Sequence, residues 1–333
     1  MRKILKKKEL SIGVVGVGHL GKRHLENVIK SDMVHCSGFY DIDKQKSKKI
    51  INENGIKSHS SLDALLKESD AIIIAVPTTE HFKIAKECLN KRKNIFIEKP
   101  ICKTLKEADA LIKLSDENNC FIQVGHIERL NPAIFTLKKE KIKLNPRYIE
   151  IQRLAPFNSR GTDVPVVLDL MIHDLDILLS LIDSTVEKID ATGISIMTNS
   201  IDIANARIKF KNGCVANITS SRIAQDYVRK LKVFEKNRYI TVDFLKGLTE
   251  IYKVLDLEEK IKSNAITTPF IRNGKEKRIV YEKPQQNKFD ALQMELKNFI
   301  ESNKKISKPI VSGKDGREAL NLAITIQKKI EEG

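Results

Sequence analysis

The sequence lacks several features that define large classes of proteins. It contains no tryptophan, and aromatic residues make up only 5% of its 333 residues. Aromatic side chains do not interleave with basic ones as in a base-stacking platform, so we expect no nucleic-acid partner despite a formal net charge of +16. The lysines are spread along the whole chain, which is typical of solvated surfaces, and their charge favours an anionic small substrate through electrostatic steering.

Cysteine is scarce, and long apolar runs are absent. The chain has five widely spaced cysteines and no C-x-x-C pair, so we expect neither a disulfide framework nor a metal site. No apolar run approaches the roughly 18 residues that a membrane-spanning helix requires, and no apolar signal-peptide core follows the basic N-terminus. We therefore expect a cytoplasmic protein that does not bind a membrane.

The first part of the chain alternates strand signals with helix signals. Short apolar runs occur at residues 10–16, 34–41, 70–77, 94–100 and 120–126, and segments with helical spacing lie between them. This rhythm is typical of βαβ units, which form a doubly wound parallel sheet. We therefore predict an α/β domain of the Rossmann type over residues 1–125.

The rhythm changes after Gly125. Long strand-like segments occur between residues 187 and 255, with turn-like sequences at 211–214 and 235–239, and two amphipathic helices end the chain. This pattern predicts an α+β domain over residues 126–333, with a mostly antiparallel open sheet. The C-terminal helix is in a position to pack back on the first domain.

A glycine motif links the first strand to the first helix. The motif G-x-G-x-x-G consists of Gly16, Gly18 and Gly21, with His19 and Leu20 between the last two. In this context the glycines allow a tight turn, the approach of a pyrophosphate to the helix N-terminus and close helix–sheet packing. All five residues are therefore predicted to bind a dinucleotide.

An acidic residue that follows the second strand indicates which dinucleotide is bound. Asp41 lies 25 residues after Gly16, close to the usual spacing of a carboxylate that binds the ribose 2′-hydroxyl. Such a carboxylate repels a 2′-phosphate, so NAD is favoured over NADP. Lys44 and Lys46 nevertheless keep NADP open as the less favoured cofactor.

A lysine closes the fourth predicted strand. Lys99 lies in the sequence I-E-K-P, between Glu98 and Pro100, at the strand edge where open α/β sheets bind ligands. Val76 and Pro77 end the neighbouring strand and are predicted to wall the nicotinamide pocket. A surface charge is the alternative interpretation of Lys99, but the constrained backbone around it favours a functional role.

Charged residues interrupt the apolar segment V-V-L-D-L-M-I-H-D-L-D-I-L-L at residues 166–179. Asp169 and His173 are four residues apart and therefore share one face of the predicted helix, with Asp176 near that face. Asp174 points elsewhere and is expected to be a solvated or capping charge. The rest of the helix is apolar, so we expect it to be largely buried.

Together these motifs resemble the Gfo/Idh/MocA family of oxidoreductases. The resemblance rests on the glycine motif, E-K-P, D-x-x-x-H, and a P-x-x-x-H-x-x-x-A-x-x-x-L segment that includes His81. It implies nicotinamide-dependent oxidation or reduction at a sugar or polyol carbon, and an open sheet that often forms the interface of a homodimer or homotetramer. It also implies that Lys99, Asp169 and His173 are the catalytic residues.

Chemical roles follow for these three residues. Neutral His173 is suited to accept the hydroxyl proton, and the Lys99 ammonium to stabilise developing alkoxide charge. Asp169 would bind a neighbouring hydroxyl or orient the imidazole. The sequence leaves open whether Lys99 or His173 is the formal base. Met171 stands where many relatives have glycine and is expected to narrow the pocket or to shift the helix.

The segment after the fifth strand carries further candidate residues. His126 and Glu98 are predicted to contact the cofactor together with His81, and Arg129 is a candidate substrate ligand, with a salt bridge between the two domains as the alternative. Arginines before the helix, Arg153 and Arg160, suit a diphosphate, and Arg160 is predicted to bind substrate.

The segment around these arginines resembles the nucleotide-sugar branch of the family, which predicts oxidation at C3 of UDP-N-acetylglucosamine. The alternatives are oxidation of inositol, a free sugar or a sugar acid, and a non-catalytic nicotinamide sensor.

Overall fold

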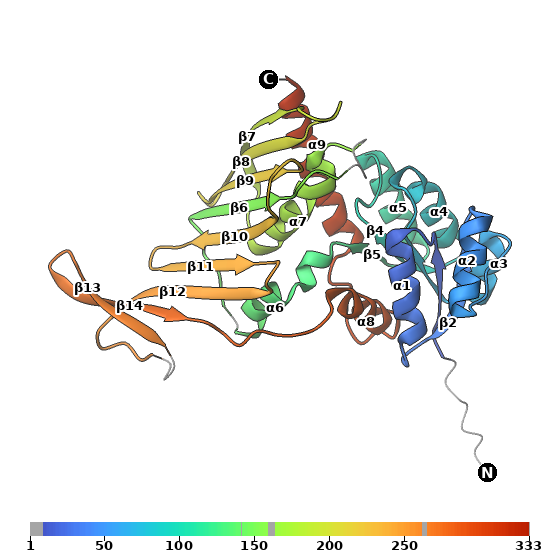
Figure 1. Ribbon diagram of the computed structural model, residues 1–333, viewed down its shortest axis with the longest axis horizontal. Coiled ribbons are helices and arrows are strands. Elements are labelled where there is room, and N and C mark those ends of the chain that lie inside the picture. Colours follow the sequence, from blue (N-terminus) through green and yellow to red (C-terminus); the bar gives the residue numbers. More distant parts are fainter. Residues whose placement is uncertain (1–8, 141, 159–163, 262–264, 333) are drawn as a thin grey trace, which may run out of the picture. The chain divides into compact units, whose positions relative to one another are not determined.

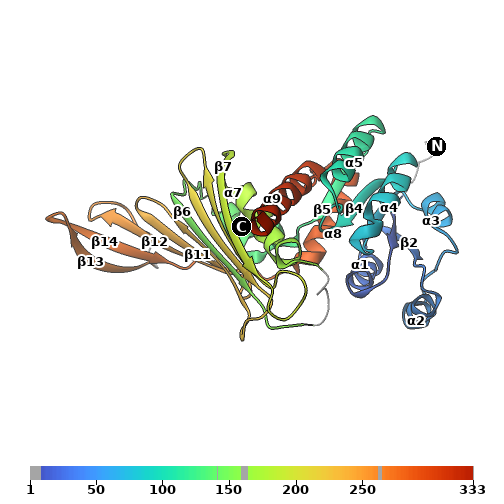
Figure 2. The same cartoon turned by 90° about the horizontal axis from the view of Figure 1, so that it is seen from above.

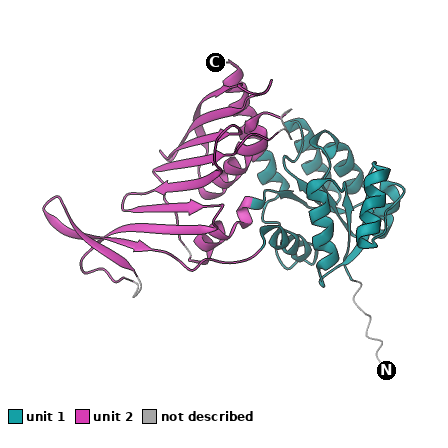
Figure 3. Ribbon diagram, in the orientation of Figure 1, with its two compact units in different colours: residues 1–127, 290–318 teal, residues 128–289, 319–333 magenta. Residues whose placement is uncertain are grey.

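The chain divides into two compact units (Figure 3), which we describe separately. The computed structural model describes residues 9–140, 142–158, 164–261 and 265–332. Unit 1 consists of residues up to 127 together with 290–318, and unit 2 of residues 128–289 and 319–333. The sequence predicts a single boundary at residues 125/126, whereas the chain returns to unit 1 for residues 290–318.

Unit 1 contains a parallel sheet with the strand order β2-β1-β3-β4-β5. Figure 1 labels three of these strands and the helices around them. The strands are β1 (Ser11–Val15), β2 (His35–Tyr40), β3 (Ala71–Ile74), β4 (Asn94–Glu98) and β5 (Ile122–Gly125). The helices are α1 (His19–Lys30), α2 (Lys44–Asn54), α3 (Leu62–Glu68), α4 (Thr78–Asn90), α5 (Leu105–Glu117) and α8 (Ala291–Asn303). The strand order confirms the predicted doubly wound α/β sheet.

Helix α8 belongs to the hydrophobic core of unit 1, which explains why the chain returns to this unit at residue 290. Leu296, Phe299 and Ile300 of α8 are buried in the same apolar cluster as strands β1 and β4 and helix α1. The ring of Phe299 packs edge-on against Phe96 of β4, with ring centroids 6.0 Å apart. Helix α8 therefore completes one face of the Rossmann sheet, although nearly 200 residues separate it from β4 in the sequence.

Unit 2 contains a sheet with the strand order β13-β14-β12-β11-β10-β6-β9-β8-β7. The strands are β6 (Tyr148–Leu154), β7 (Val186–Ile194), β8 (Ile203–Phe210), β9 (Val215–Ser221), β10 (Val228–Phe234), β11 (Arg238–Asp243), β12 (Leu248–Asp256), β13 (Ile266–Arg272) and β14 (Lys275–Glu282). Within the described strands every pairing is antiparallel except β6 with β9. The mostly antiparallel sheet is confirmed, and hairpin turns lie within both predicted turn sequences, 211–214 and 235–239.

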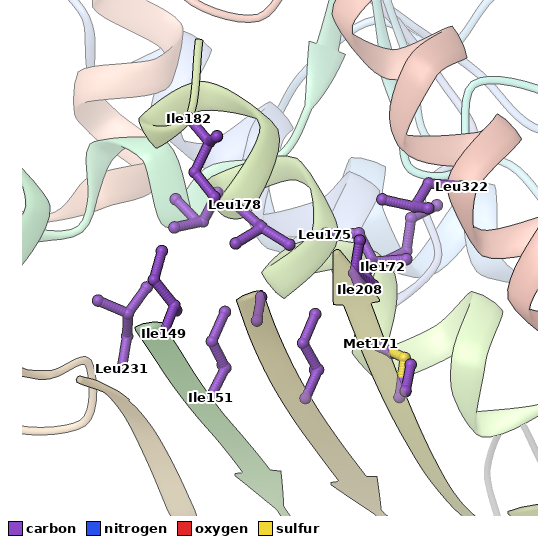
Figure 4. Packing of buried hydrophobic residues seen from close by; sticks show 14 of the residues in the cluster. Ile149, Ile151, Met171, Ile172, Leu175, Leu178, Ile182, Ile208, Leu231 and Leu322 are labelled. Carbon is purple, nitrogen blue, oxygen red and sulfur yellow. The ribbon is translucent and has the colours of Figure 1, made fainter. Parts of the chain in front are cut away.

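Helices cover one face of this sheet. They are α6 (Pro132–Lys139), a π-helical turn (Val167–Met171) that leads into α7 (Ile172–Leu181), and α9 (Gly313–Glu332), which begins in unit 1. Figure 2 shows α7 and the end of α9 beside the sheet. The apolar side chains of α7 face those of the strands (Figure 4): Ile172, Leu175 and Leu178 from the helix, and Ile149, Ile151, Ile208 and Leu231 from the sheet.

The opposite face of the sheet carries a row of aromatic rings, which we call the aromatic stripe. Neighbouring rings along it lie 4.7 to 5.6 Å apart between centroids. The stripe consists of Tyr148, Phe234, Tyr239, Tyr252 and Tyr281, one from each of β6, β10, β11, β12 and β14. These residues alternate along their strands with the buried core residues, and all five are half-buried.

Across the described residues, no helix has both the length and the apolar content needed to cross a bilayer.

Candidate functional site

The glycine loop of unit 1 has the shape of a cradle for a phosphate group. Gly16 adopts a left-handed backbone with φ of 83°, and a Cβ there would lie 2.7 Å from the Ala75 carbonyl oxygen. A Cβ at Gly21 would lie 1.9 Å from the Gly16 carbonyl oxygen, which is impossible without displacing the loop. A Cβ at Gly18, in contrast, meets no protein atom within 4 Å. Protein atoms therefore require glycine at 16 and 21, whereas the space beside Gly18 is open for a ligand.

The N-terminus of α1 opens onto this space. Gly18 caps the helix without any side-chain hydrogen bond, and His19 and Leu20 in the first turn are exposed. The backbone N–H groups of the first turn have no partner within a helix, and together with the helix dipole they attract anions. The loop therefore fits the pyrophosphate of a dinucleotide.

A cleft of about 410 Å³ adjoins the glycine loop. It is lined by Gly16 and Gly18, by residues 40–43 at the end of β2, and by Ala75, Val76 and Pro77 after β3. The cleft lies at the carboxyl ends of neighbouring parallel strands, where such sheets bind ligands. Sequence motifs separated by up to 60 residues are thus brought together within unit 1.

Asp41 is held rigidly in the wall of this cleft. One carboxylate oxygen accepts a hydrogen bond of 2.8 Å from the N–H of Val17, and the other accepts one of 2.8 Å from the N–H of Asp43. Asp43 in turn caps α2 and lies 3.3 Å from the Lys46 ammonium. The Asp41 carboxylate is therefore oriented before any ribose arrives, and each oxygen has further lone pairs for hydroxyl groups.

Lys99 follows the last residue of β4 and is half-buried. Glu98 precedes it and is almost completely buried, and one Glu98 oxygen accepts a hydrogen bond of 3.3 Å from the backbone N–H of Lys99. The other oxygen lies 2.6 Å from the Nε2 atom of His24 on α1. The peptide bond between Lys99 and Pro100 is cis.

His81 ties two loops of unit 1 together. Its Nδ1 atom lies 2.9 Å from the carbonyl oxygen of Pro100, and its Nε2 atom lies 3.0 Å from that of Val76. Burial lowers the pKa of His81, although both carbonyl contacts and the charge of Glu98 act in the opposite direction. Since both nitrogens contact backbone carbonyls, the imidazole fixes the segments around Val76 and Lys99. Direct contacts of His81 and the buried His126 with a cofactor stay predictions.

In unit 2, Asp169 and His173 lie on one continuous helical segment and are both half-buried. Asp169 belongs to the π-helical turn and His173 to the first turn of α7. Such π-helical turns occur frequently at functional sites. Met171 lies between them and is completely buried in the core beneath the helix (Figure 4). The expectation that Met171 narrows a substrate pocket is therefore wrong, and a shift of the helix by its side chain stays a prediction.

Both acidic residues of α7 form salt bridges with arginines. The Asp174 carboxylate accepts two hydrogen bonds of 2.8 Å from Arg153 of β6, and Arg153 also donates to Glu128 at 3.0 Å. Burial raises the pKa of Asp174 in spite of the arginine. The expectation of a solvated or capping Asp174 is therefore wrong, and Arg153 is a core residue and does not line an entry loop.

Arg129 makes the equivalent pair with Asp176. Its Nε and Nη2 groups donate to the two carboxylate oxygens at 2.8 and 2.7 Å, and the Asp176 side chain is completely buried. Arg129 thus forms a salt bridge within unit 2, and not the expected one between domains. Contact of Arg129 with a substrate stays a prediction. Arg160 lies outside the described residues.

Comparison with known proteins extends over both units. The model of the Gfo/Idh/MocA oxidoreductase family, with an NAD-binding Rossmann fold, matches residues 10–126, and the model of the family's C-terminal domain matches residues 152–240. The chain is 33% identical to UDP-N-acetylglucosamine 3-dehydrogenase from Acidithiobacillus ferrooxidans over 319 residues, which cover 96% of each chain.

Two further comparisons place that similarity in context. The solved structure of the Acidithiobacillus ferrooxidans enzyme superposes with a TM-score of 0.86 over 97% of this chain and 98% of that one. Myo-inositol 2-dehydrogenase from Thermotoga maritima is 25% identical over 97% of each chain.

Proposed function

This chain belongs to the Gfo/Idh/MocA oxidoreductase family, and from that premise we propose that it oxidises the C3 hydroxyl of UDP-N-acetylglucosamine to the 3-keto sugar with NAD. The observation that carries the proposal is the near full-length similarity to an enzyme with that name. The glycine loop and the residues Lys99, Asp169 and His173 support it, because each corresponds to a motif of the family.

We propose NAD as the cofactor, with NADP less favoured. The glycine loop would hold the pyrophosphate at the N-terminus of α1, and Asp41 would bind the ribose hydroxyls. A 2′-phosphate would meet the negative charge of Asp41 and of Asp43 beside it, although Lys46 offsets part of that charge. When bound, the nicotinamide supplies a hydride acceptor.

The protein residues handle the proton of the same reaction. The C3 carbon loses a hydride, the C3 hydroxyl loses a proton, and the carbon–oxygen bond becomes a carbonyl. Lys99 as ammonium would hold the hydroxyl oxygen and stabilise negative charge as it develops. His173 would take the proton at a ring nitrogen, and Asp169 would orient the imidazole or bind the adjacent hydroxyl. Arg160 and Arg129 are the proposed contacts of the diphosphate.

A second candidate function is the oxidation of inositol, which the similarity to the Thermotoga maritima enzyme favours. A free sugar or a sugar acid belongs to the same class of substrate. A non-catalytic nicotinamide sensor would have no need for Lys99, Asp169 and His173 together, so their joint presence supports an enzyme.

We also propose that the chain assembles into a homodimer or homotetramer through the face of the unit 2 sheet that carries the aromatic stripe. Five half-buried aromatic rings, four of them tyrosines, lie side by side on this face, and tyrosine is enriched in protein–protein interfaces. Phe234→Lys and Tyr239→Lys would place charges in that surface. Light scattering should then give the monomer mass, whereas an unchanged oligomer would reject this interface.

The substrate is tested by incubating the protein with NAD and UDP-N-acetylglucosamine, UDP-glucose, myo-inositol or glucose. When the equilibrium favours the alcohol over the 3-keto product, little NADH accumulates. Each reaction therefore includes an aminotransferase and glutamate, which convert the keto sugar to an amine. The products are identified by mass spectrometry. An aminated UDP-sugar supports the proposal. Reduction of NAD by myo-inositol alone would favour the second candidate.

A further inference from the structure

His24 and Glu98 form a buried hydrogen-bonded pair directly behind Lys99. His24 lies on α1, the helix that begins at the glycine loop, and Glu98 ends β4. The Nε2–Oε1 distance is 2.6 Å, and the two residues are 2% and 9% exposed. His24 is six residues after Gly18, on the buried face of α1.

The surrounding residues leave space for this pair. Glu98 is opposite Gly125 of β5 in the strand register, and a Cβ at Gly125 would lie 2.9 Å from the second Glu98 oxygen. The ring of Phe96 packs against the His24 ring, with the two ring centroids 5.0 Å apart. Buried ionic pairs are costly to desolvate, and apolar residues often replace them without loss of stability. Stability alone therefore does not account for a carboxylate here.

Glu98 is held in its charged form. Burial alone would raise the pKa of Glu98, but the hydrogen bond and charge of His24, together with the charge of Lys99, bring it below its ordinary value. An ionised carboxylate only accepts hydrogen bonds, so Nε2 of His24 carries the proton and donates. The titratable groups that interact with Glu98 are His24 from α1, Lys99 directly after β4 and His81 from α4.

We propose that His24 is a positioning residue for Lys99 and acts through Glu98. His24 fixes one carboxylate oxygen, and the other receives the backbone N–H of Lys99. The pair therefore sets both the direction in which the lysine leaves β4 and the negative charge beside its ammonium group. The inference rests on the proposed function of Lys99 in hydride-transfer chemistry.

The test compares two substitutions of His24. In His24→Gln the side-chain amide offers an N–H near the position of Nε2, whereas His24→Leu offers no donor. His24→Leu should lose roughly ten- to hundredfold in kcat, the value of a hydrogen bond to a charged group, and His24→Gln should recover most of it. The KM for the sugar and the Kd for NADH should stay within about twofold of the wild-type values, because the glycine loop is untouched.

The pH profile separates positioning from a general loss of structure. Without the donor, burial acts against a weaker opposing influence and raises the pKa of Glu98 above its wild-type value, so the carboxyl group stays protonated to higher pH. The kcat of His24→Leu should therefore rise with pH where wild-type kcat is flat. His59→Leu is the matched control, because His59 is also a buried histidine of unit 1 but contacts the Ser37 carbonyl oxygen at 2.8 Å. Its pH profile should match that of the wild type.

A pH titration of the Glu98 carboxyl carbon by NMR tests the His24–Glu98 hydrogen bond independently of enzyme activity. We expect the Glu98 carboxyl of the full-length protein to titrate at clearly higher pH in His24→Leu than in the wild type. Equal titration would overturn the inference, as would a His24→Gln variant as slow as His24→Leu, or a loss of NADH affinity parallel to that of kcat. Full turnover in Lys99→Met would instead reject the proposed catalytic function, and the NMR result would still decide the pairing.

Discussion

The guanidinium of Arg153 donates two hydrogen bonds of 2.8 Å to the carboxylate of Asp174, so strand β6 is joined to helix α7 by a buried ion pair. A second such pair joins Arg129 to Asp176 two residues further along the helix. Two of the acidic residues that interrupt the apolar segment therefore anchor α7, one to strand β6 and the other to the helical turn before α6. Asp169 and His173, the candidate catalytic residues, lie immediately before this anchored region.

Removing one member of the first pair should destabilise unit 2 severely. Arg153→Met leaves the Asp174 carboxylate buried without its partner, and we expect a loss of about 3–5 kcal/mol in the free energy of unfolding. Arg153→Met/Asp174→Leu should recover more than half of that loss, because Glu128 keeps Arg229 at 3.6 Å. Urea denaturation measures both values. A double variant no more stable than the single one would show that the pair is not the cause.

The glycine loop offers a matched pair of substitutions. Gly18→Ala places a methyl group where no protein atom lies within 4 Å, so the melting temperature should hardly change while NAD affinity falls at least roughly tenfold. Gly21→Ala places it 1.9 Å from the Gly16 carbonyl oxygen and should lower the melting temperature as well. Calorimetry and NADH fluorescence separate the two effects. Undiminished NAD affinity in Gly18→Ala would place the dinucleotide elsewhere.

Cofactor selectivity should depend on Asp41. Asp41→Ser removes the charge that opposes a 2′-phosphate, so the ratio of the NADPH and NADH dissociation constants should shift toward NADPH by roughly tenfold or more. NADH itself should also bind more weakly, because the carboxylate orients Val17 and Asp43. Asp43→Asn keeps the α2 cap and is the control for charge alone. If this ratio of dissociation constants is unchanged in Asp41→Ser, another group recognises the 2′ position of the ribose.

Asp202 should contribute a defined acid dependence to the stability of unit 2. Burial would raise its pKa, but hydrogen bonds from the Thr198 side chain and from the N–H groups of residues 196–198 lower it from 3.8 to about 2. Because the pKa of Asp202 is lower in the folded protein, its ionised carboxylate stabilises the folded state at pH values above the unfolded pKa. This stabilisation is lost as the pH falls toward 2. Asp202→Asn should therefore cost about 1–2 kcal/mol near neutral pH, and the difference should vanish in acid. A pH-independent difference would contradict this account.

Local patterns in the sequence predict much of the fold. The glycine loop, the alternation of strands and helices, and the two hairpin turns are short-range features whose residue types dictate backbone geometry. The predictions do not include helix α6, although the sequence carries its signal: Asn131 caps the helix and Pro132 occupies its first position. Long-range pairs carry no such signal: His24 and Glu98 are 74 residues apart, and Arg129 and Asp176 are 47.

The same limit applies to the aromatic stripe and to the interpretation of single charges. Four of the six tyrosines align only when the register of five strands is known. Asp174 resembles a solvated charge in the sequence because its partner, Arg153, lies on a strand whose position cannot be read from the helix. Charge alone therefore did not distinguish substrate ligands from structural pairs.

The most direct test of the account is the initial rate at which the wild type and Lys99→Met form the aminated UDP-sugar from UDP-N-acetylglucosamine, NAD, glutamate and an aminotransferase. We expect a robust rate for the wild type and a rate roughly 10²- to 10⁴-fold lower for Lys99→Met, with NADH affinity retained. Equal rates for the two proteins, or no aminated product from a wild type that oxidises another alcohol, would contradict it.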